Sequence, residues 1–336
     1  MRNEIVAIKT IQTFNYGNRL QNFAVQEIIR KSGFNVETIS SEENLSLANR
    51  MKWWIKRTLF SDKRANFHRF NKRIAFSKSI FNTNQITNCY AIVVGSDQVW
   101  NTTFKVVDDT FFLPYVHPRK ISFSASFGVD SIPYDQKTVD FLNDFKALSV
   151  REEAGAKIIK DLTGRDATVL VDPTMLLTQE EWRKVSKKPR GAKEGYILTY
   201  FLSPKCDEAK TKLEDVREDK EVYELLNPND KVAGTAGPSE FLWLFEHADL
   251  ILTDSFHACV FSFLFNKPFI VYDRNWNEGN MNSRLETLLS KFSLKRKYAN
   301  SGLPNDIWEH DYTEGYKQLE IERKKAINFL KKALED

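Results

Sequence analysis

Short apolar runs alternate with amphipathic stretches along most of the chain. Near the start, residues 4–11 (EIVAIKTI) are rich in β-branched residues and predict a strand. Apolar side chains then recur at helical spacing over 20–34, and Gly33 predicts the end of that helix. Residues 35–40 predict a second strand. A strand, a helix and another strand in this order are typical of a parallel α/β sheet.

The same alternation continues to the end of the chain, with one interruption. We predict strands at 90–94, 120–126, 147–152, 167–173, 196–202, 222–226, 249–254 and 268–273, and helices at 239–248 and 255–266. Residues 183–194 (RKVSKKPRGAKE) interrupt this order with six basic residues, one Pro and one Gly. Such a polar stretch is typical of a linker between domains.

Two domains follow from this order, and the length of 336 residues agrees at about 150 residues per domain. The predicted parts are an N-terminal Rossmann-like domain (1–182) with a basic helical insertion (45–85), a linker (183–194), a C-terminal Rossmann-like domain (195–312), and an amphipathic helix (313–336) that packs back on the N-terminal domain. The fold class is therefore α/β and GT-B-like, with two doubly wound domains facing a central cleft. In such domains ligands bind at the carboxyl ends of strands, so polar residues after each strand are the candidates for chemistry.

The composition is that of an ordinary globular protein. Hydrophobic residues make up 42% of the chain and charged residues 28%, which excludes a disordered chain or a fibrous repeat. Three dispersed cysteines, without a CxxC motif, fit a reducing cytoplasm better than a disulfide framework or a zinc site. The longest apolar stretch, 258–265, is far shorter than the roughly 20 residues that span a bilayer. We expect a cytoplasmic protein that is at most peripheral to the inner face of the cytoplasmic membrane.

Positive charge is concentrated in one segment. Residues 50–78 contain ten Lys or Arg and a single acid, Asp62, so this segment carries +9 while the whole chain carries +4. Trp53 and Trp54 lie among the basic residues, and the apolar residues that follow keep helical spacing. A basic amphipathic helix with Trp predicts contact with an anionic membrane surface. The alternative is a solvated helical insertion with its aromatic residues in the core; no nucleic-acid partner is expected, because no known binding module accompanies the segment.

Two loops of the N-terminal half carry polar residues directly after a strand. Asn15 and Asn18 lie where a Rossmann unit has its phosphate loop, although a turn with an Asn helix cap fits equally. The second loop follows strand 90–94, and its polar residues are Gly95, Ser96, Asp97 and Gln98. Gly95 permits close approach of a ligand to the backbone, and Asp97 offers a carboxylate. Capping of the next helix by Ser96 or Asp97 is the alternative.

Three further positions carry groups that suit an anionic ligand. Arg151, followed by Glu152, can clamp a phosphate or carboxylate, or it can pair with the neighbouring glutamates. Asp254 ends a strand, Ser255 is placed as a helix N-cap and His257 lies in the first helical turn, where backbone N–H groups attract anions. Asp172, before a Pro, is interpreted as a structural turn, and Asp273 and Arg274 are further candidates after the last core strand.

Five motifs, in order over residues 10–275, resemble the polysaccharide pyruvyl transferase family. They are NYGN with LQ following, GSDQVWN, SVREE, DPTMLL and TDSFH with NKPF. The resemblance implies a GT-B-like fold and transfer of the enolpyruvyl group of phosphoenolpyruvate onto two sugar hydroxyls, with release of phosphate. The acceptor implied is a hexose of a capsular or exopolysaccharide precursor, carried on a lipid. The chemistry requires cations or amides, an acid and a base, but no metal or redox cofactor.

The resemblance also assigns roles to residues. His257 would handle the proton at carbon or phosphate, Arg151 and the helix start at Ser255 would hold the anions, and Asp97 would accept the sugar proton. The predicted substrate-binding residues are Asn15, Asn18, Gly95, Ser96, Gln98, Glu152, Asp254 and Ser255. Many members carry a basic residue at the position of Ser255, so here an anion contact is missing or is supplied from elsewhere.

Two other functions remain open at this point. A GT-B glycosyltransferase would use the same helix N-terminus for the diphosphate of a nucleotide sugar. A non-catalytic protein of polysaccharide assembly would keep the fold, with Ser255 as a mark of lost activity.

Overall fold

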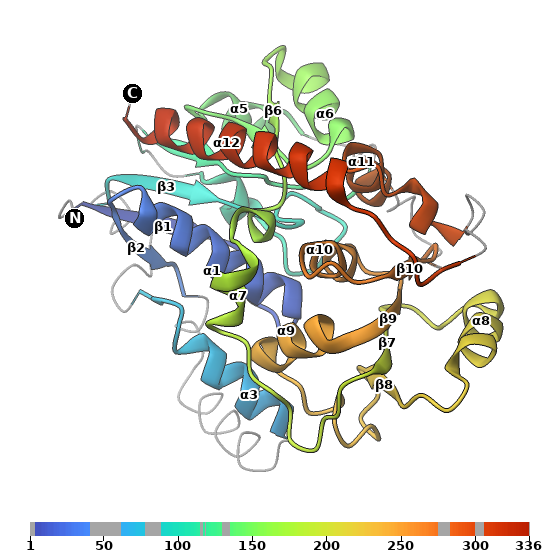
Figure 1. The fold of residues 1–336 in the computed structure, drawn as a ribbon. Helices are drawn as coiled ribbons and strands as arrows, with labels where there is room; N and C mark the ends of the chain where they lie inside the picture. Colours follow the sequence, from blue (N-terminus) through green and yellow to red (C-terminus); the bar gives the residue numbers. More distant parts are fainter. Residues whose placement is uncertain are drawn as a thin grey trace. The chain divides into compact units, whose positions relative to one another are not determined.

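The structure is a computed structural model that describes residues 4–40, 62–77, 89–114, 117, 119–129, 135–274, 283–299 and 306–335 (Figure 1). The chain divides into two compact units, which are described separately below. Unit 1 comprises Met1–Leu59, Asn71–Leu176 and Ile321–Asp336, and unit 2 comprises Phe60–Phe70 and Leu177–Glu320.

Unit 1 contains a parallel four-stranded sheet in the order β2-β1-β3-β4. Its strands are β1 (Ile5–Lys9), β2 (Asn35–Thr38), β3 (Ala91–Val94) and β4 (Lys120–Ser122), and β5 (Ser149–Val150) and β6 (Thr168–Val169) form a second parallel pair. Single bridges from Ile121 to Ala147 and from Ala125 to Val150 join β4 and the residues after it to the β5 strand region. The helices are α1 (Tyr16–Lys31), α5 (Gln136–Asn143) and α6 (Glu153–Thr163), with short 3-10 turns η2 (Asp109–Phe112) and η3 (Pro173–Leu176).

An aromatic cluster fixes the loop that follows β3. Trp100 is fully buried, and the ring centroids of Phe112, Phe127 and Phe145 lie 5.8, 5.2 and 5.7 Å from its own. Its indole Nε1 donates a hydrogen bond to the carbonyl of Phe111 over 3.0 Å. Because a large ring at the end of the GSDQVW motif is anchored in the core, the polar residues before it are held in a fixed place.

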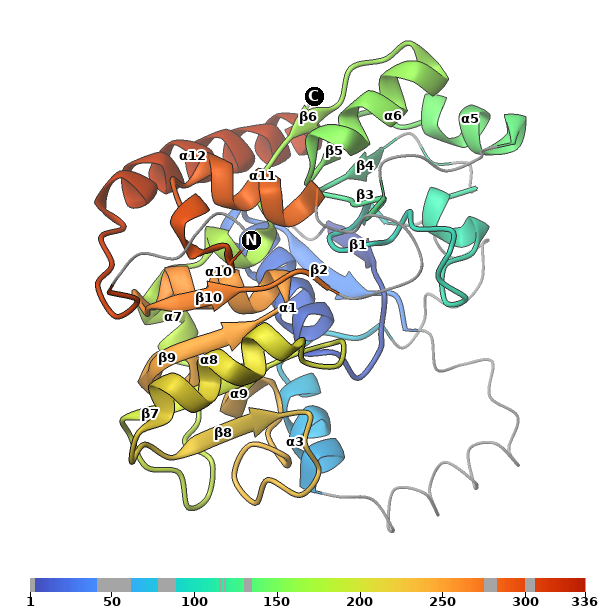
Figure 2. The same ribbon diagram turned by 90° about the vertical axis from the view of Figure 1, so that its right-hand side faces the viewer.

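Unit 2 contains a second parallel sheet, in the order β10-β9-β7-β8, and Figure 2 shows these four strands side by side. The strands are β7 (Tyr196–Tyr200), β8 (Val222–Leu225), β9 (Ala248–Thr253) and β10 (Phe269–Val271). Its helices are α3 (Asp62–Asn71), α7 (Gln179–Arg183), α8 (Asp207–Arg217), α9 (Pro238–His247), α10 (Phe256–Leu264) and α11 (Ser283–Lys291), with a 3-10 turn η4 (Lys295–Lys297).

The side chains of β7 explain why helices cover both faces of this sheet. Ile197 belongs to a core cluster with Leu213 of α8. Tyr196 and Tyr200 point to the other face, where their rings contact Trp243 and Phe241 of α9. Successive residues of a strand face opposite sides, so a strand that is apolar throughout requires a layer on each side.

Both sheets reverse their strand order at one point. In unit 1, β2 lies on one side of β1 and β3 on the other; in unit 2, β8 lies on one side of β7 and β9 on the other. The loops after β1 and β3, and those after β7 and β9, therefore diverge from neighbouring strand ends. This topological switch point is where open α/β sheets bind ligands.

The observed units differ from the predicted domains in two places. Residues 183–194 belong to unit 2, and Val185 and Ala192 are buried there, so the segment is part of the unit rather than a linker. Helix α3, predicted within an insertion of the N-terminal domain, also belongs to unit 2, where the Asn66 amide donates to the carbonyl of Thr235 over 2.9 Å. Polar composition is a weak signal of a domain boundary, because a loop fastened by a few apolar residues has the same composition.

The buried aromatic residues of α3 agree with the alternative to the predicted membrane contact. Phe67 and Phe70 are buried within the protein, as the alternative of a helical insertion with core aromatics required. Trp53, Trp54 and the rest of 50–61 lie outside the described residues. Among the residues that are described, no helix is long and apolar enough to cross a bilayer.

The C-terminal helix α12 (Thr313–Glu335) contributes to both units. In its first part, the Tyr316 hydroxyl donates to the carbonyl of Phe263 over 2.8 Å within unit 2. The part from Ile321 onward belongs to unit 1, where Arg323 Nε donates to the carbonyl of Met175 over 2.7 Å. An amphipathic helix of this length can meet two cores because its apolar stripe runs along its whole length.

Candidate active site

The loop after β3 in unit 1 has a backbone that tolerates only certain residues. Gly95 has φ +119°, and a Cβ there would lie 2.4 Å from the carbonyl oxygen of Phe123. The close approach that the sequence suggested is therefore an approach of protein backbone. Asp97 also has a positive φ, +71°, and its carbonyl accepts from the Ser126 N–H over 2.9 Å. This backbone hydrogen bond therefore helps to fix the position from which Asp97 extends its carboxylate.

The start of α1 holds the same loop from the other side of the switch point. Asn15 is the N-cap, and its side chain accepts from the Asn18 N–H over 3.4 Å, as the capping alternative required. The Asn18 amide donates to Asp97 Oδ2. Gln21 accepts from the Ser96 N–H over 2.8 Å. The loops after β1 and β3 are thus joined by side chains, and Asp97 lies at the joint.

Arg151, after β5, is buried between two carboxylates. Its Nη2 donates to Asp97 Oδ1 over 3.2 Å, and its Nη1 donates to Asp172 Oδ2. The guanidinium side chain is only 2% exposed. Burial alone would lower the pKa of Arg151, but the negative charges of Asp172, Asp97 and Glu152 outweigh this and raise the pKa. Arg151 is therefore a cation held in place, and carboxylates of the protein balance its charge.

Asp172 is the residue whose importance the sequence understated. Its Oδ1 accepts from the N–H and the hydroxyl of Thr174 over 2.9 and 2.6 Å, which is the predicted turn. Its Oδ2 accepts from Arg151, and its side chain is fully buried. A single carboxylate thus both builds the turn after β6 and orients Arg151. The signal that could have found this role is its place at the carboxyl end of the predicted strand 167–173, in the DPTMLL motif.

Glu152 and Gln98 fasten a neighbouring loop. Glu152 Oε1 accepts from the Ser126 hydroxyl and from the N–H groups of Phe127 and Gly128, over 3.0, 2.8 and 3.2 Å. Gln98 accepts from the Asn101 amide over 2.8 Å. Gly128 has φ +73°, a backbone conformation that favours glycine, so the loop needs Gly there. In both predicted binding residues, one side-chain oxygen therefore accepts hydrogen bonds from the protein itself.

Unit 1 thus brings its predicted site residues together, with one carboxylate nearest to solvent. Ser96 is fully buried, and its hydroxyl donates to the Ser124 carbonyl over 2.7 Å. Asp97 has an 11% exposed side chain, compared with 2% for Arg151. The group best placed to meet a substrate in unit 1 is therefore the Asp97 carboxylate.

Asp254 joins the two loops of the switch point in unit 2. Its Oδ1 accepts from the Leu202 N–H over 2.7 Å, and its Oδ2 accepts from the N–H and hydroxyl of Ser203 over 2.9 and 2.7 Å. The residue is fully buried. Asp254 therefore ties the loop after β7 to the end of β9, which is a positioning role.

The start of α10 lies beside this joint. Ser255 occupies the N-cap position with an extended backbone, but its side chain makes no capping hydrogen bond. His257 is the second residue of the helix and is 8% exposed, with its ring edge-on to Phe256 at 5.4 Å. The first N–H groups of a helix have no partner within it and carry its positive end, so this is a favourable place for an anion.

Arg274, from the segment after β10, adds a cation at the same place. Its Nη2 donates to the Asp254 carbonyl over 3.2 Å, and its Nε lies 3.8 Å from Asp254 Oδ2. Its side chain is 11% exposed. The guanidinium therefore meets the residue that directly precedes the α10 N-cap, which joins Arg274 to Ser255 and His257 as one group.

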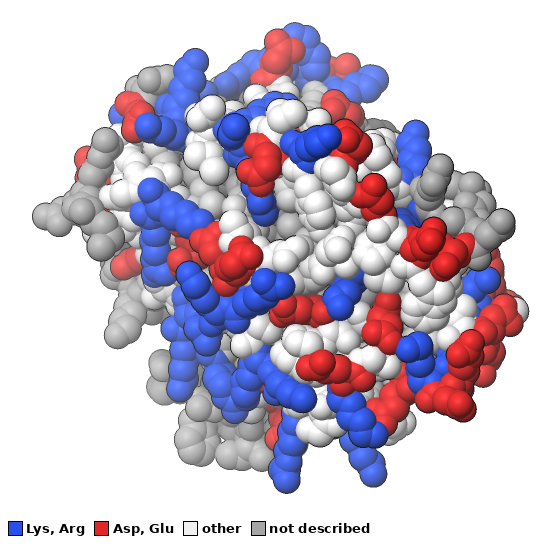
Figure 3. Space-filling model, viewed as in Figure 1, with Lys and Arg blue, Asp and Glu red and all other residues white. Residues whose placement is uncertain are grey.

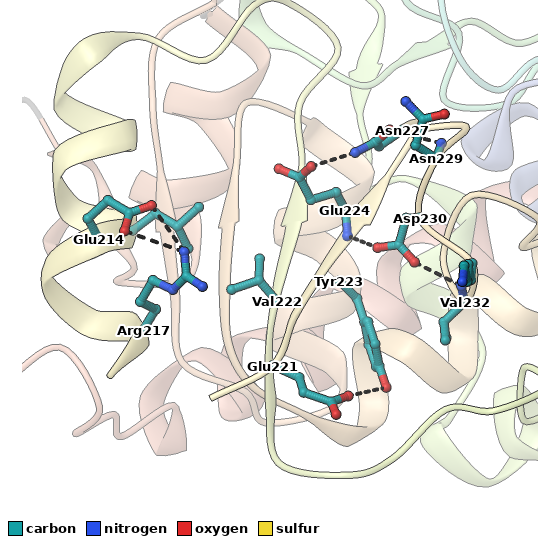
Figure 4. Close-up of a pocket in the computed structure, with 12 residues that line it drawn as sticks. Glu214, Arg217, Glu221, Val222, Tyr223, Glu224, Asn227, Asn229, Asp230 and Val232 are labelled. Atoms are coloured by element: carbon teal, nitrogen blue, oxygen red, sulfur yellow. Dashed lines mark hydrogen bonds and ion pairs between the residues drawn. The ribbon is translucent and has the colours of Figure 1, made fainter. Parts of the chain in front are cut away.

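A cavity of about 560 Å³ lies elsewhere in unit 2, along β8 (Figure 4). Its lining includes Glu221, Tyr223, Glu224, Asn227 and Asp230, and it contains none of the predicted site residues. Asp230 accepts from the Glu224 N–H over 2.7 Å, which occupies an outward-facing donor of the edge strand. We interpret the residues around this cavity as a cover that keeps the edge strand β8 from pairing with another strand.

Comparison with solved structures identifies the fold. The chain resembles Arabidopsis thaliana UGT89C1 complexed with UDP-L-rhamnose, with a TM-score of 0.52, 9% identity, and coverage of 99% of this chain and 100% of that one. It is also similar to the UDP-GlcNAc 2-epimerase of Methanocaldococcus jannaschii, with a TM-score of 0.47, 13% identity, and coverage of 94% and 98%. The chain therefore has a GT-B-like α/β fold of two Rossmann-like units, as predicted.

Comparison of the sequence identifies the family. No curated protein sequence matches the chain significantly. The family model for polysaccharide pyruvyl transferase matches residues 15–275, which include both switch points and the motifs around Asp97, Arg151 and His257. The chain belongs to the polysaccharide pyruvyl transferase family.

Proposed function

We propose that this transferase uses phosphoenolpyruvate as donor and forms a pyruvate ketal on two hydroxyls of a hexose in a capsular or exopolysaccharide precursor. The observation that carries the proposal is the family match over 15–275, which spans every candidate site residue from Asn15 to Arg274. The acceptor is carried on a lipid, and the protein works at the inner face of the cytoplasmic membrane. The reaction proceeds without a metal or redox cofactor.

The reaction sets requirements that the two switch points can meet. Phosphoenolpyruvate is protonated at its methylene carbon, and a sugar hydroxyl attacks the resulting cationic carbon. Phosphate leaves, and a second hydroxyl closes the ketal. The site must hold a phosphate and a carboxylate, provide an acid and provide a base.

The donor's anionic groups bind at the start of α10, with Arg274 as the cation. The helix N-terminus supplies N–H groups, and Arg274 supplies charge at Asp254, next to the N-cap. Arg151 is less suited to this task, because Asp97 and Asp172 already occupy its guanidinium. We therefore reassign the anion contact from Arg151 to Arg274, which also answers how the cation absent at Ser255 is supplied.

Each unit contains one residue suited to proton transfer. His257 lies in the first turn of α10 and is placed to exchange a proton with a donor bound at that helix end. Asp97 accepts the proton of the attacking sugar hydroxyl. Arg151 and Asn18 orient the Asp97 carboxylate by bonds to different oxygens, so they act as positioning residues.

A coupled phosphate-release assay tests this proposal. The purified chain is mixed with phosphoenolpyruvate and a panel of lipid-linked and soluble hexosides. We expect phosphate release that requires an acceptor, and a pyruvate ketal in the product by NMR. Absence of phosphate release with every acceptor, together with no thermal shift by phosphoenolpyruvate, would overturn the proposal.

A GT-B glycosyltransferase is the second candidate, and the likeness to the fold of UGT89C1 favours it. This alternative predicts that a nucleotide diphosphate raises the melting temperature and that phosphoenolpyruvate does not. A non-catalytic assembly protein predicts that neither ligand changes the melting temperature. The same thermal-shift experiment therefore separates all three functions.

A further inference from the structure

The segment 183–193 of unit 2 exposes basic side chains, and its backbone is fixed to the rest of the unit. It contains six basic residues and no acid. Val185 and Ala192 are buried, and the N–H groups of Lys187 and Lys193 donate to the Ser239 carbonyl and the Tyr223 hydroxyl over 3.0 and 3.1 Å. The apolar residues between the cations thus hold the loop on the protein, and its charged side chains point outward.

Helix α3 brings a second basic run to the same place. Lys187 Nζ lies 3.3 Å from Glu240 Oε1, and Arg69 Nη1 lies 4.0 Å from the same oxygen. The side chains of Lys187 and Arg69 are 55% and 57% exposed, whereas that of Glu240 is 5% exposed. Two basic runs that are far apart in the sequence therefore meet over one buried acid. We call this surface the basic face; it consists of Arg69, Lys184, Lys187, Lys188 and Arg190. The neighbouring Arg183 and Lys193 are paired with Glu246 and Glu221 and are not counted in it.

Unit 2 is electrically polar because its other end is acidic. Residues 207–219, which include α8, contain six acidic and three basic residues. Figure 3 shows Lys and Arg gathered over α3 and the 183–193 segment, and Asp and Glu gathered near α8. A body with such a charge separation is oriented by a charged plane, with its positive end toward negative charge.

The basic face offers charge but no exposed aromatic side chain, and this favours some anionic partners over others. Trp243, the aromatic residue beneath it, is 8% exposed and is covered by Lys188, whose Nζ lies 5.1 Å from the ring centroid. Single-stranded nucleic acids require exposed aromatic platforms for their bases. Among the described residues, the exposed large apolar side chains are Phe14, Val106, Leu226, Trp308, Ile321 and Ile327, and none belongs to the basic face. A lipid headgroup surface requires only charge.

We propose that the basic face binds the surface of an anionic lipid bilayer. The contact is electrostatic and does not insert apolar side chains, since the aromatic residues of α3 are buried in the protein. It must therefore weaken with salt, because the Debye length shortens from about 10 Å at 0.1 M to about 3 Å at 1 M ionic strength. The contact deepens the location at the membrane proposed above and is independent of the proposed reaction. Of the predicted membrane segment 50–78, the basic face includes Arg69 alone.

Vesicle co-sedimentation of the full chain tests the inference. The vesicles contain phosphatidylcholine alone or phosphatidylcholine with phosphatidylglycerol. The variant Lys184→Glu/Lys188→Glu/Arg190→Glu reverses three cations of the basic face. The control Lys210→Glu/Lys212→Glu/Arg217→Glu makes the same change in net charge on α8. We expect the wild type and the control to sediment with anionic vesicles only, and the variant to bind at least about 10-fold more weakly.

Three results would overturn the inference. The first is anionic-vesicle binding by the variant that equals that of the wild type, which would place any contact outside the basic face. The second is an equal loss in the α8 control, which would mean a non-specific response to net charge. The third is binding of a soluble polyanionic glycan by the basic face without binding of vesicles. Melting temperature and phosphate release with a soluble acceptor are measured on both variants, so that a folding defect or a failure of the proposed reaction is distinguished from loss of membrane binding.

Discussion

The two switch points are built alike but leave different charges available. In each unit, an Asp after the switch-point strand reaches across to the neighbouring loop and pairs with an Arg from another strand end: Asp97 with Arg151, and Asp254 with Arg274. In unit 1 a second carboxylate, Asp172, shares the Arg, whose side chain is 2% exposed. In unit 2 the Arg274 side chain is 11% exposed and its Nε lies 3.8 Å from Asp254 Oδ2.

Because of this difference, we assign Arg151 mainly to stability and Arg274 mainly to ligand binding. A guanidinium between two carboxylates already has its charge balanced, so a third anion gains less from it, and removing the guanidinium leaves buried carboxylate charge without a partner, which is costly. A guanidinium beside a helix N-terminus lies where an anionic ligand would bind and can be drawn to it. We therefore expect substitutions in unit 1 to act mainly on folding and substitutions in unit 2 to act mainly on turnover.

The largest effect is expected at His257. If the imidazole transfers a proton, His257→Ala should lower the rate of phosphate release by about 10²–10⁴-fold, with little change in melting temperature. The control is His310→Ala, which removes a half-buried imidazole of the same unit that is not among the candidate site residues. Turnover close to wild type in His257→Ala would remove the acid from the proposed mechanism.

Arg151 should show the opposite pattern. Arg151→Met leaves Asp97 and Asp172 buried without their cation, so the free energy of unfolding should fall by about 3–5 kcal/mol in urea denaturation. Arg274→Met, the matched change in unit 2, should cost much less. If Arg151→Met unfolds like the wild type but no longer binds phosphoenolpyruvate, Arg151 is the anion ligand and the comparison is wrong.

Arg274 should affect donor binding more than the chemical step. Arg274→Gln removes the charge beside the α10 N-terminus, so the KM for phosphoenolpyruvate should rise about 10-fold while kcat changes less. Arg274→Lys keeps the charge and should recover part of the loss. An unchanged KM in the Gln variant would leave the helix N-terminus without its proposed cation.

The smallest effect is expected at Tyr272, at the end of β10. Its buried hydroxyl has no hydrogen-bond partner among the described residues, so Tyr272→Phe should be neutral or stabilise the protein by up to about 1 kcal/mol. In Tyr196, by contrast, the hydroxyl donates to the Leu244 carbonyl over 2.7 Å, and Tyr196→Phe should destabilise by about 1 kcal/mol. Thermal denaturation of the two variants should shift in opposite directions, and a loss of stability in Tyr272→Phe would reveal a polar role for that hydroxyl.

Much of the fold was predictable because its signals are local. A buried run such as AIVV followed directly by GSDQ marks both a strand and the polar loop after it, and β3 is confirmed at Ala91–Val94. The helix predicted over 255–266 is observed at Phe256–Leu264. The domain boundaries were less predictable, since residues 183–194 have the composition of a linker but are held by Val185 and Ala192.

The sequence by itself determined which polar residues follow which strands, because strand and helix periodicity and the turn residues between them act over a few positions. Only the tertiary structure decided which of these residues meet. The order of strands in the sheet brings Arg151 to Asp97 and Asp172, and α1 brings Asn18 to Asp97, across 54, 21 and 79 positions of the chain. Packing then decided that Arg151 is shared by two carboxylates and that Arg274 lies beside Asp254, which precedes the α10 N-cap. The meeting of α3 with the 183–193 segment over Glu240 has the same origin, since contacts between distant segments depend on packing, for which local sequence carries no signal.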